Sequence, residues 1–272
     1  MLIFHEIDNM KLKRRFLLGA IASLLCYAGL IEPNWIRTRS YDLEIPGLAR
    51  DVTVVEIGDI HTNRMGLRER RALDAVRRAD PDYVFVAGDL LKSNSKPAQG
   101  LDFLSRLSAK KGIYFVLGNA DGALRDEIER GTIPRAFGKW RVLENESVDC
   151  GDFTLVGIDD PVTCRDNSDL AFKGVPAGKP IFVLAHFHAK RLMAKLEQAG
   201  VSVVFTGHTH GGQIGVGPLV SHVPYAHRSP YVAGLYKLNG ARLYVTRGVG
   251  TNIFPLRLFC RPEIAVFHLK GV

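Results

Sequence analysis

The chain has 272 residues, 46% of them hydrophobic, and a formal net charge of +8. This length allows one large domain with its own buried core. The four cysteines, Cys26, Cys150, Cys164 and Cys260, are far apart in the sequence, which excludes a disulfide framework and a zinc-knuckle pattern.

Much of the positive charge lies in the last quarter of the chain. Residues 211–272 hold seven Lys or Arg residues and one acid, Glu263, which gives this stretch a net charge of +6. The charge fits either an anionic partner or an ordinary solvated basic surface. The cations form no dense basic run, so we expect no nucleic acid as a partner.

The N-terminus has the features of a signal or a membrane anchor. Lys11, Lys13, Arg14 and Arg15 precede residues 16–31, a mostly apolar stretch without charge. These 16 residues are fewer than the roughly 20 that span a hydrocarbon core, so an anchor, an interfacial helix and an export signal all remain open. The RRFLL run at 14–18 resembles a twin-arginine export signal. We expect membrane association in a bacterium, on the cytoplasmic face or after export.

Three segments are expected along the chain. Residues 1–33 form the signal or anchor, residues 34–50 a linker or entry strand, and residues 51–272 the catalytic domain. From residue 51 the chain alternates short apolar runs with amphipathic segments, which is typical of an α/β sandwich.

The first half of the domain is predicted to consist of three strand-helix steps. A strand at 52–57 leads to Asp59 and His61, and a helix follows at 67–79. A strand at 83–87 leads to Asp89, a helix follows at 101–107, and a strand at 113–117 leads to Asn119. Ligands of α/β proteins lie at the carboxyl ends of strands, so we expect these side chains at one edge of the sheet.

The second half is predicted to be richer in strands. Strands are expected at 153–158 and 181–184, and the second leads to His186. A helix at 189–198 and a strand at 201–205 follow, and the strand leads to His208 and His210. Strands at 235–238, 243–246 and 263–269 close the domain. Residues 122–138, directly after Asn119, are expected to form a loop that shapes specificity.

Carboxylate, imidazole and amide oxygen donors are the groups that a two-metal hydrolytic site needs. Two cations roughly 3.5 to 4 Å apart lower the pKa of a bound water and clamp phosphoryl oxygens. The donors at the predicted strand ends are Asp59, His61, Asp89, Asn119, His186, His208 and His210. Glycines at 58, 88, 118 and 207 precede four of these motifs and allow tight strand-to-loop turns.

The ordered motifs resemble those of the calcineurin-like metallophosphoesterases: Asp-x-His, Gly-Asp, Gly-Asn, a lone His and Gly-His-x-His, spread over residues 58–210. The resemblance implies a four-layer α/β/β/α sandwich behind the N-terminal hydrophobic segment. It implies that a metal-bridging hydroxide is the nucleophile and that Asp89, Asn119 and His208 act in catalysis. It assigns Asp59, His61 and His210 to one metal, Asn119, His186 and His208 to the other, and Asp89 to both.

Motifs in the C-terminal part of the chain resemble one branch of this family in particular. GHTHGGQI at 207–214, YVTRGVG at 244–250 and PLR at 255–257 are similar to a bacterial branch of membrane-associated or exported phosphodiesterases, related to the UDP-2,3-diacylglucosamine hydrolases. We expect manganese as the metal, and iron, zinc or cobalt would also suit these N and O donors.

Two positions depart from the family pattern. Ala120 stands where many members carry a His that assists the leaving group, and Ala cannot transfer protons. This favours anhydrides or activated diesters, whose leaving groups need less acid assistance. Lys92 replaces an acid often found three positions after the bridging Asp, which puts the support of that loop in doubt.

Several single residues allow more than one interpretation of their role. His188 is an alternative ligand to His186, a substrate contact, or merely a surface residue. Arg247 and Arg257 could bind substrate phosphate, although Arg on late strands more often forms structural ion pairs. His222 and His227 lie in a Pro-rich loop near the expected mouth of the site.

The sequence therefore predicts a membrane-associated hydrolase of a phosphodiester or pyrophosphate. Its substrate would be an anionic, phosphate-containing molecule, and the sharpest hypothesis is a lipid-linked one such as UDP-2,3-diacylglucosamine of lipid A synthesis. A broad-specificity exported phosphodiesterase is the alternative enzyme. A non-catalytic metal-binding scaffold is the alternative of another class.

Overall fold

Two mixed β-sheets form the centre of the molecule in the computed structural model, which describes residues 2–215 and 229–272. The first sheet has the order β1-β13-β2-β3-β4-β6-β5 and the second the order β11-β12-β10-β9-β8-β7. The strands of the first sheet are β1 (Arg37–Ile45), β2 (Val52–Ile57), β3 (Tyr83–Val86), β4 (Gly112–Phe115), β5 (Ala136–Phe137), β6 (Trp140–Val142) and β13 (Glu263–Gly271). Those of the second are β7 (Glu146–Asp149), β8 (Thr154–Ile158), β9 (Ile181–Ala185), β10 (Val201–Thr206), β11 (Gly234–Lys237) and β12 (Arg242–Val245).

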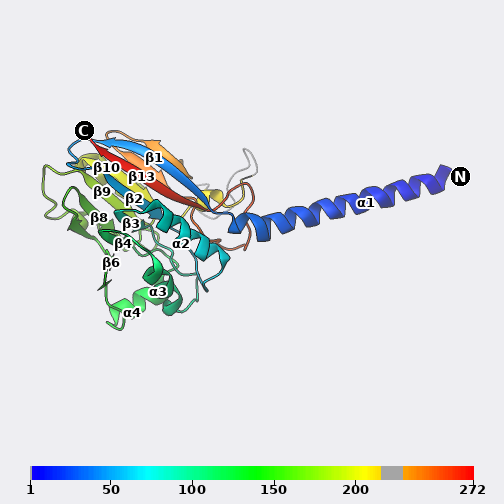
Figure 1. Ribbon diagram of the computed structural model, residues 1–272, viewed down its shortest axis with the longest axis horizontal. Coiled ribbons are helices and arrows are strands. Elements are labelled where there is room, and N and C mark those ends of the chain that lie inside the picture. The colour runs from blue at the N-terminus through cyan, green and yellow to red at the C-terminus, as the bar shows by residue number, and fades with distance from the viewer. Residues whose placement is uncertain (1, 216–228) are drawn as a thin grey trace.

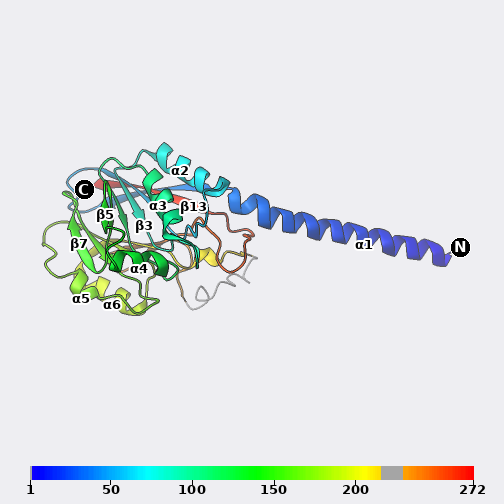
Figure 2. The same cartoon turned by 90° about the horizontal axis from the view of Figure 1, so that it is seen from below.

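Helices cover the outer face of each sheet. The helices α2 (Leu67–Ala79), α3 (Pro97–Arg106) and α4 (Gly122–Glu129) pack on the seven-stranded sheet and share one buried cluster with it. The short α5 (Ser168–Ala171) and α6 (Lys190–Ala199) lie on the six-stranded sheet with a cluster of their own (Figure 2). The layers are therefore helix, sheet, sheet and helix, which confirms the predicted α/β/β/α class.

The core between the sheets is built from apolar residues of their inner faces. Phe153 stacks on Phe182 with ring centroids 4.4 Å apart, and Phe85 meets Phe205 edge to face at 5.3 Å. Their side chains are fully buried, and each large aromatic ring removes a large apolar area from water. This contact fixes how the edges of the two sheets face each other.

Parallel pairing brings the carboxyl ends of the central strands together. The strands β2, β3 and β4 run parallel in the first sheet, and β8, β9 and β10 run parallel in the second. Their carboxyl ends in each sheet therefore share one edge, as the alternation of strands and helices predicted.

Most predicted elements occur within a few residues of their expected bounds, and β2 and α2 match the expected ranges 52–57 and 67–79. Residues 122–138 are not a continuous loop, because Leu124 and Ile128 are buried and form the inner face of α4. Residues 37–45, within the range expected as a linker or entry strand, form the edge strand β1, which pairs with β13 along its whole length.

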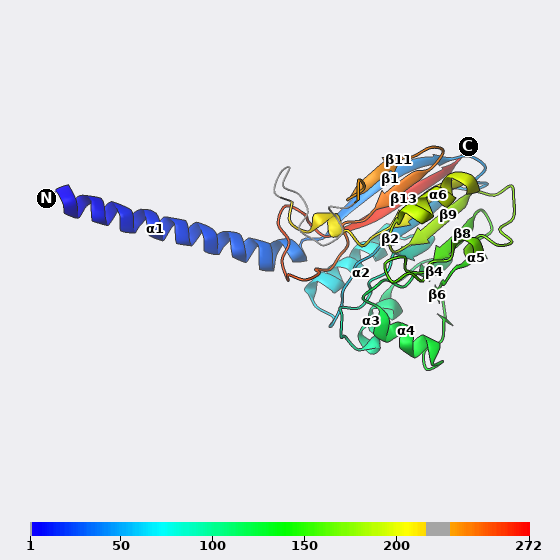
Figure 3. The same cartoon turned by 180° about the vertical axis from the view of Figure 1, so that it is seen from behind.

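The N-terminal helix extends away from the sandwich. Helix α1 (Leu2–Cys26) continues into a π-helical turn, η1 (Tyr27–Ile31), and a 3-10 turn, η2 (Glu32–Asn34), which meet the domain (Figures 1 and 3). Among the described residues, one helical segment, Met10–Asn34, is long and apolar enough to cross a membrane, with a mean hydropathy of 1.7. Its 25 residues exceed the 16 apolar ones counted in the sequence, because the helix continues through charged and polar residues on both sides.

Candidate metal centre

The predicted ligands lie in loops directly after the strands, and several adopt an unusual backbone conformation. Asp59, His61, Asp89, His208 and His210 have positive φ angles between 44° and 72°. Residues other than glycine rarely adopt this left-handed region, and such strain concentrates at functional sites. The backbone therefore holds these five side chains in fixed directions that a regular strand would not give.

A first buried cluster consists of Asp59, His61 and His210. One ligand atom from each residue lies within 4.8 Å of the others. The Nε2 atoms of the two histidines are 3.0 Å apart, and His210 Nε2 is 3.7 Å from Asp59 Oδ1. Asp59 and His61 come from the first sheet and His210 from the second, so the cluster exists only where the two sheets meet.

A second cluster consists of Asp89, His186 and His208. The Nε2 atom of His186 lies 3.0 Å from His208 Nδ1 and 3.5 Å from Asp89 Oδ1. Asn119 joins this group, with its Oδ1 3.1 Å from His186 Nε2. The His186 Nδ1 atom is 2.9 Å from the Ala87 carbonyl oxygen and donates to it, which directs Nε2 into the cluster.

Asp89 connects the two clusters. Its Oδ2 lies 3.4 Å from His61 Nε2 in the first cluster, while its Oδ1 faces His186 in the second. The backbone N–H of Ala120 donates to the same Oδ1 at 2.7 Å and fixes the carboxylate. This is the geometry expected of a carboxylate shared between two ions.

Burial keeps three of the imidazoles neutral. It lowers the pKa of His61 to about 4 and that of His208 to about 3, and it lowers the pKa of His210 well below its usual value. Neutral imidazoles offer the lone pairs that metal ions bind. Burial also raises the pKa of the Asp59 carboxyl to about 7.

The pKa of His186 is raised, whereas those of the other three histidines are lowered. Burial alone would lower its pKa, but the carboxylates of Asp89 and Asp59 outweigh that effect and raise it to about 9. For Asp89, burial opposes ionisation, yet His186 and His61 hold its pKa below the usual value. The cluster thus pairs carboxylate charge with a cationic imidazole, whose proton a metal ion would replace.

The donor set fits two divalent cations. Each cluster combines a carboxylate with two imidazoles, a mixture that suits first-row transition metals. The Nε2 atoms of the neutral His61 and His210 are 3.0 Å apart, so that two lone pairs face each other in the first cluster. A cation in that cluster would bind both lone pairs, and a cation in the second cluster would replace the proton of His186.

Glycine is required where loops pass close to the ligands. A Cβ atom at position 118 would lie 2.3 Å from Asp89 Oδ1, and one at position 207 would lie 2.8 Å from Asp59 Oδ2. Both distances are shorter than any real carbon contact with an oxygen. The Gly-Asn and Gly-His motifs therefore owe their glycines to these close approaches.

Asp121 is a supporting residue that the sequence analysis did not single out. Its carboxylate accepts hydrogen bonds from Leu91 N at 2.8 Å and Gly118 N at 2.9 Å, and so joins the loops that carry Asp89 and Asn119. Burial raises its pKa to about 7. The only sequence signal for this role is its position two residues after Asn119.

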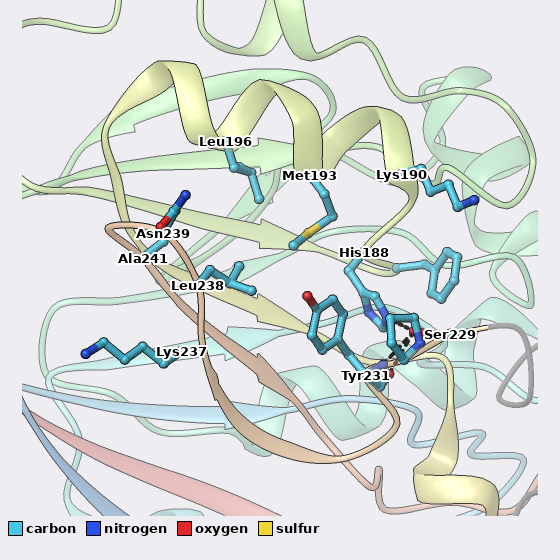
Figure 4. Close-up of a pocket in the computed structure, with 12 residues that line it drawn as sticks. His188, Lys190, Met193, Leu196, Ser229, Tyr231, Lys237, Leu238, Asn239 and Ala241 are labelled. Atoms are coloured by element: carbon cyan, nitrogen blue, oxygen red, sulfur yellow. Dashed lines mark hydrogen bonds between the residues drawn. The ribbon is translucent and has the colours of Figure 1, made fainter.

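His188 lies outside both clusters. Its Nε2 is 2.5 Å from Ser229 Oγ, and burial lowers its pKa to about 4. Figure 4 shows its ring beside Ser229 and Tyr231, in a cavity of about 580 Å³ whose wall includes Met193 of α6. Of the two candidate ligands after β9, the structure thus brings His186, and not His188, to the other ligands.

The two arginines considered for substrate contact hold parts of the protein together. Arg247 Nη1 is 2.9 Å from Glu263 Oε2. The Arg257 side chain is fully buried and donates to the carbonyl oxygens of Gly250, Cys260 and Arg247. Neither guanidinium is left open toward the metal centre by these contacts. His222 and His227 lie outside the described residues.

The structure shows what Ala120 and Lys92, the two departures from the family pattern, contact. Ala120 contributes its backbone N–H to Asp89, a role that any residue but proline can fill. Lys92 is exposed and lines a cavity beside His61. The loop of Asp89 is supported by Asp121 rather than by an acid at position 92.

Comparisons with known proteins agree with this geometry. The calcineurin-like phosphoesterase family matches residues 52–212 of the chain. An uncharacterized metallophosphoesterase of Campylobacter jejuni is 29% identical over 92% of this chain and 68% of its own length. The uncharacterized metallophosphoesterase YkuE of Bacillus subtilis is 25% identical over 95% of this chain and 98% of its own. A Danio rerio protein described as a transmembrane protein with a metallophosphoesterase domain is 27% identical, and the chain spans 61% of its length.

Proposed function

Because this chain belongs to the calcineurin-like phosphoesterase family, we propose that it hydrolyses a phosphodiester or pyrophosphate bond of a lipid-linked substrate. The observation that carries the proposal is the position of Asp89 between the two buried clusters, 3.4 Å from His61 and 3.5 Å from His186. An isolated metal site would not need a carboxylate shared in this way.

The proposed ligand assignment follows from the two clusters. Asp59, His61 and His210 would hold one ion, His186, His208 and Asn119 would hold the other, and Asp89 would serve both. When bound, two divalent cations, of which manganese is proposed, lower the pKa of a water molecule and stabilise negative charge on phosphoryl oxygens.

The residues of the chain position the substrate phosphate and exclude bulk water. Asn119 is exposed at the edge of the second cluster, and its amide nitrogen can donate to a phosphoryl oxygen. His208 is buried next to it and keeps its place through Asp59, whose Oδ2 accepts from His208 N at 2.9 Å. Together with Asp89, these residues are the proposed catalytic set.

The leaving group is expected to need little acid assistance. Position 120 offers a methyl group where many family members carry an imidazole that assists the leaving group. A phosphate leaving group from a pyrophosphate is stable as an anion, so UDP-2,3-diacylglucosamine is the substrate we propose to test first.

His188, the first of the three proposed substrate contacts, lines a cavity. It faces the largely apolar cavity of Figure 4, where Met193 and Tyr231 could contact an apolar part of the substrate. For Arg247 and Arg257 we propose a supporting role, because their guanidinium groups are already bonded to Glu263 and to carbonyl oxygens.

The test is hydrolysis by the full chain in detergent, with bis-p-nitrophenyl phosphate and UDP-2,3-diacylglucosamine as substrates. We expect turnover with Mn²⁺, its loss with chelator, and at least about a 10³-fold decrease in Asp89→Ala. Asp126→Ala is the matched control, because Asp126 is an exposed carboxylate on α4. Turnover that survives both chelator and Asp89→Ala would contradict the proposed two-metal mechanism. Cleavage of the model diester without release of UMP would reject the lipid-linked nucleotide alone.

A further inference from the structure

The end of the apolar N-terminal helix is part of the catalytic domain. The carboxylate of Glu32 is fully buried and accepts hydrogen bonds from Phe259 N at 2.9 Å and Cys260 N at 2.6 Å. The Ala28 carbonyl accepts from Arg257 N at 2.9 Å. Buried hydrogen bonds to a carboxylate are strong, so the direction in which α1 leaves the domain is fixed. We call residues 27–35 the anchor base.

The anchor base lies at the edge of the sandwich that carries the metal ligands. The segment that holds it, residues 248–260, also contacts both sides of the first cluster. Gly250 N donates to Asp59 O at 2.6 Å, and Cys260 Sγ donates to His210 O at 3.3 Å. Figures 1 and 3 show α1 leaving from this end of the molecule. A membrane around α1 would therefore lie next to the metal centre.

The surface around the anchor base is apolar. Leu30 and Ile31 of η1 are 68% and 51% exposed, and Phe254 and Phe259 of the adjoining segment are 57% and 66% exposed. Within residues 27–35 and 251–259 the two charged side chains, Glu32 and Arg257, are both fully buried. The exposed side chains of these two ranges are therefore uncharged and continue the apolar surface of α1, and the cations Arg71 and Arg261 border them at Asn34 and Trp35.

A cationic cavity joins the anchor base to the first cluster. It has a volume of about 270 Å³ and is lined by Gly29 and Pro33 of the anchor base, by the ligand His61, and by the cations Arg64, Arg68 and Lys92.

One of these cations is already paired. Arg68 Nη2 is 2.7 Å from Glu69 Oε1, whose other carboxylate oxygen accepts from Gly66 N. No ion pair involves the side chains of Arg64 or Lys92 within the part of the chain that the structure describes. The cavity thus has two uncompensated cations beside a metal ligand, an arrangement that attracts a phosphate.

We propose that this cavity binds the phosphate of a lipid that resides in the bilayer containing α1. The inference rests on the proposed function and names the side from which its substrate arrives. The phosphate pairs with Arg64 and Lys92 next to His61, while the acyl chains stay in the bilayer beside Leu30 and Phe254. The anchor then contributes a wall of the substrate site, and the reacting lipid never has to leave the membrane.

The first test measures lipid contact without using activity. The full chain is placed in phosphatidylcholine nanodiscs that contain phosphatidic acid with a diazirine next to its phosphate. We expect crosslinks on the residues around the cavity, 27–35, 61–69, 92 and 251–259, at least fivefold fewer in the double variant Arg64→Gln/Lys92→Gln. Arg78→Gln is the matched control, because it removes one exposed cation from the far end of α2. Equal crosslinking in all three proteins, or crosslinks elsewhere, would overturn the proposal.

The second test uses competition with a soluble substrate. With 20 mol% phosphatidic acid in the nanodiscs, we expect the KM for bis-p-nitrophenyl phosphate to rise about fivefold in the unaltered chain and in Arg78→Gln, and less than twofold in the double variant. If inorganic phosphate or a short-chain, water-soluble phosphatidic acid competes as well as the bilayer lipid, the bilayer is not the source and the proposal fails. If neither the diester nor UDP-2,3-diacylglucosamine is hydrolysed, the proposed function is refuted, and the crosslinking result alone decides the present proposal.

Discussion

The ligand loops of the two sheets keep their shape in different ways. In the seven-stranded sheet the loops after β2 and β3 bond to each other, with Asp59 N donating to Gly88 O and His61 N to Asp89 O, both at 3.0 Å. In the six-stranded sheet the loop after β10 depends on distant segments. His208 N donates to Asp59, and His210 O accepts from Cys260 Sγ.

The seven-stranded sheet therefore carries the more self-contained half of the site, which we call the preorganised half. The six-stranded sheet carries the half that relies more on distant segments, which we call the dependent half. The first half has direct bonds between neighbouring strand-helix steps, to which the C-terminal segment adds the bond from Gly250 N to Asp59 O. The second half relies on the C-terminal segment through Cys260 and, through Glu32, on the anchor base. A ligand loop that is held by hydrogen bonds from distant segments is sensitive to substitutions far from the metal centre. The two halves should therefore respond differently to substitution. The following predictions test this contrast.

The largest effect is expected where the two halves meet. His61→Ala and His210→Ala each remove one imidazole from the first cluster, and we expect each to lower kcat about 10³-fold, about 4 kcal/mol in activation free energy. Because both act through the same ion, the double variant should lose little more than either single one. Steady-state kinetics of the three variants provide the test, and additive losses would show that the histidines serve separate functions.

The next effect concerns the segment that supports the dependent half. Arg257→Met removes a buried guanidinium and leaves the carbonyl oxygens of Gly250 and Cys260 without donors. We expect the free energy of unfolding to fall by about 3 kcal/mol, measured by urea denaturation. Arg78→Met is the control, because that side chain is exposed on α2. A loss below about 1 kcal/mol would mean that the C-terminal segment does not depend on this residue.

A smaller effect is expected in the preorganised half. Asp121→Asn replaces one of the two oxygens that accept from Leu91 N and Gly118 N with an NH₂ group, which cannot accept. The loops of Asp89 and Asn119 then separate slightly, and we expect about a tenfold lower kcat with little change in KM. Asp126→Asn on the surface of α4 should behave like the unaltered chain. A change in KM alone would assign Asp121 to substrate binding.

The smallest effect concerns Glu56, a buried carboxyl on β2 near Asp59. Burial, together with the charges of Asp59 and Glu263, raises its pKa well above the ordinary value of 4.5, against a smaller opposing effect of the Thr246 hydroxyl. A carboxyl with a raised folded-state pKa contributes its full stability below about pH 4.5, and this is lost as the pH rises through the folded-state pKa.

Glu56→Gln, which cannot ionise, should therefore stabilise the metal-free protein at pH 8. We expect Tm to rise by about 2 °C or more, the shift that about 1 kcal/mol gives in a chain of this size. The difference should vanish at pH 4, as thermal unfolding in chelator can show. A destabilised variant at pH 8 would mean that the ionised carboxylate has a partner in the folded protein.

The amino-acid sequence by itself determined the strand-helix order and the position of each ligand after a strand. Apolar periodicity and the Gly-Asp, Gly-Asn and Gly-His motifs depend on neighbouring residues, so they can be read locally. They identified β2 and α2 with their observed bounds and placed Asp59, His61, Asp89 and Asn119 at one edge.

Only the tertiary structure decided which residues face one another. His61 and His210 are 149 positions apart and meet through the packing of two sheets. After β9, the side chain of His186 points into the second cluster and that of His188 does not. The buried guanidinium of Arg257 binds carbonyl oxygens of the protein. The docking of Glu32 against Phe259 and Cys260, 227 and 228 residues away, has no local signal, because it depends on the completed fold.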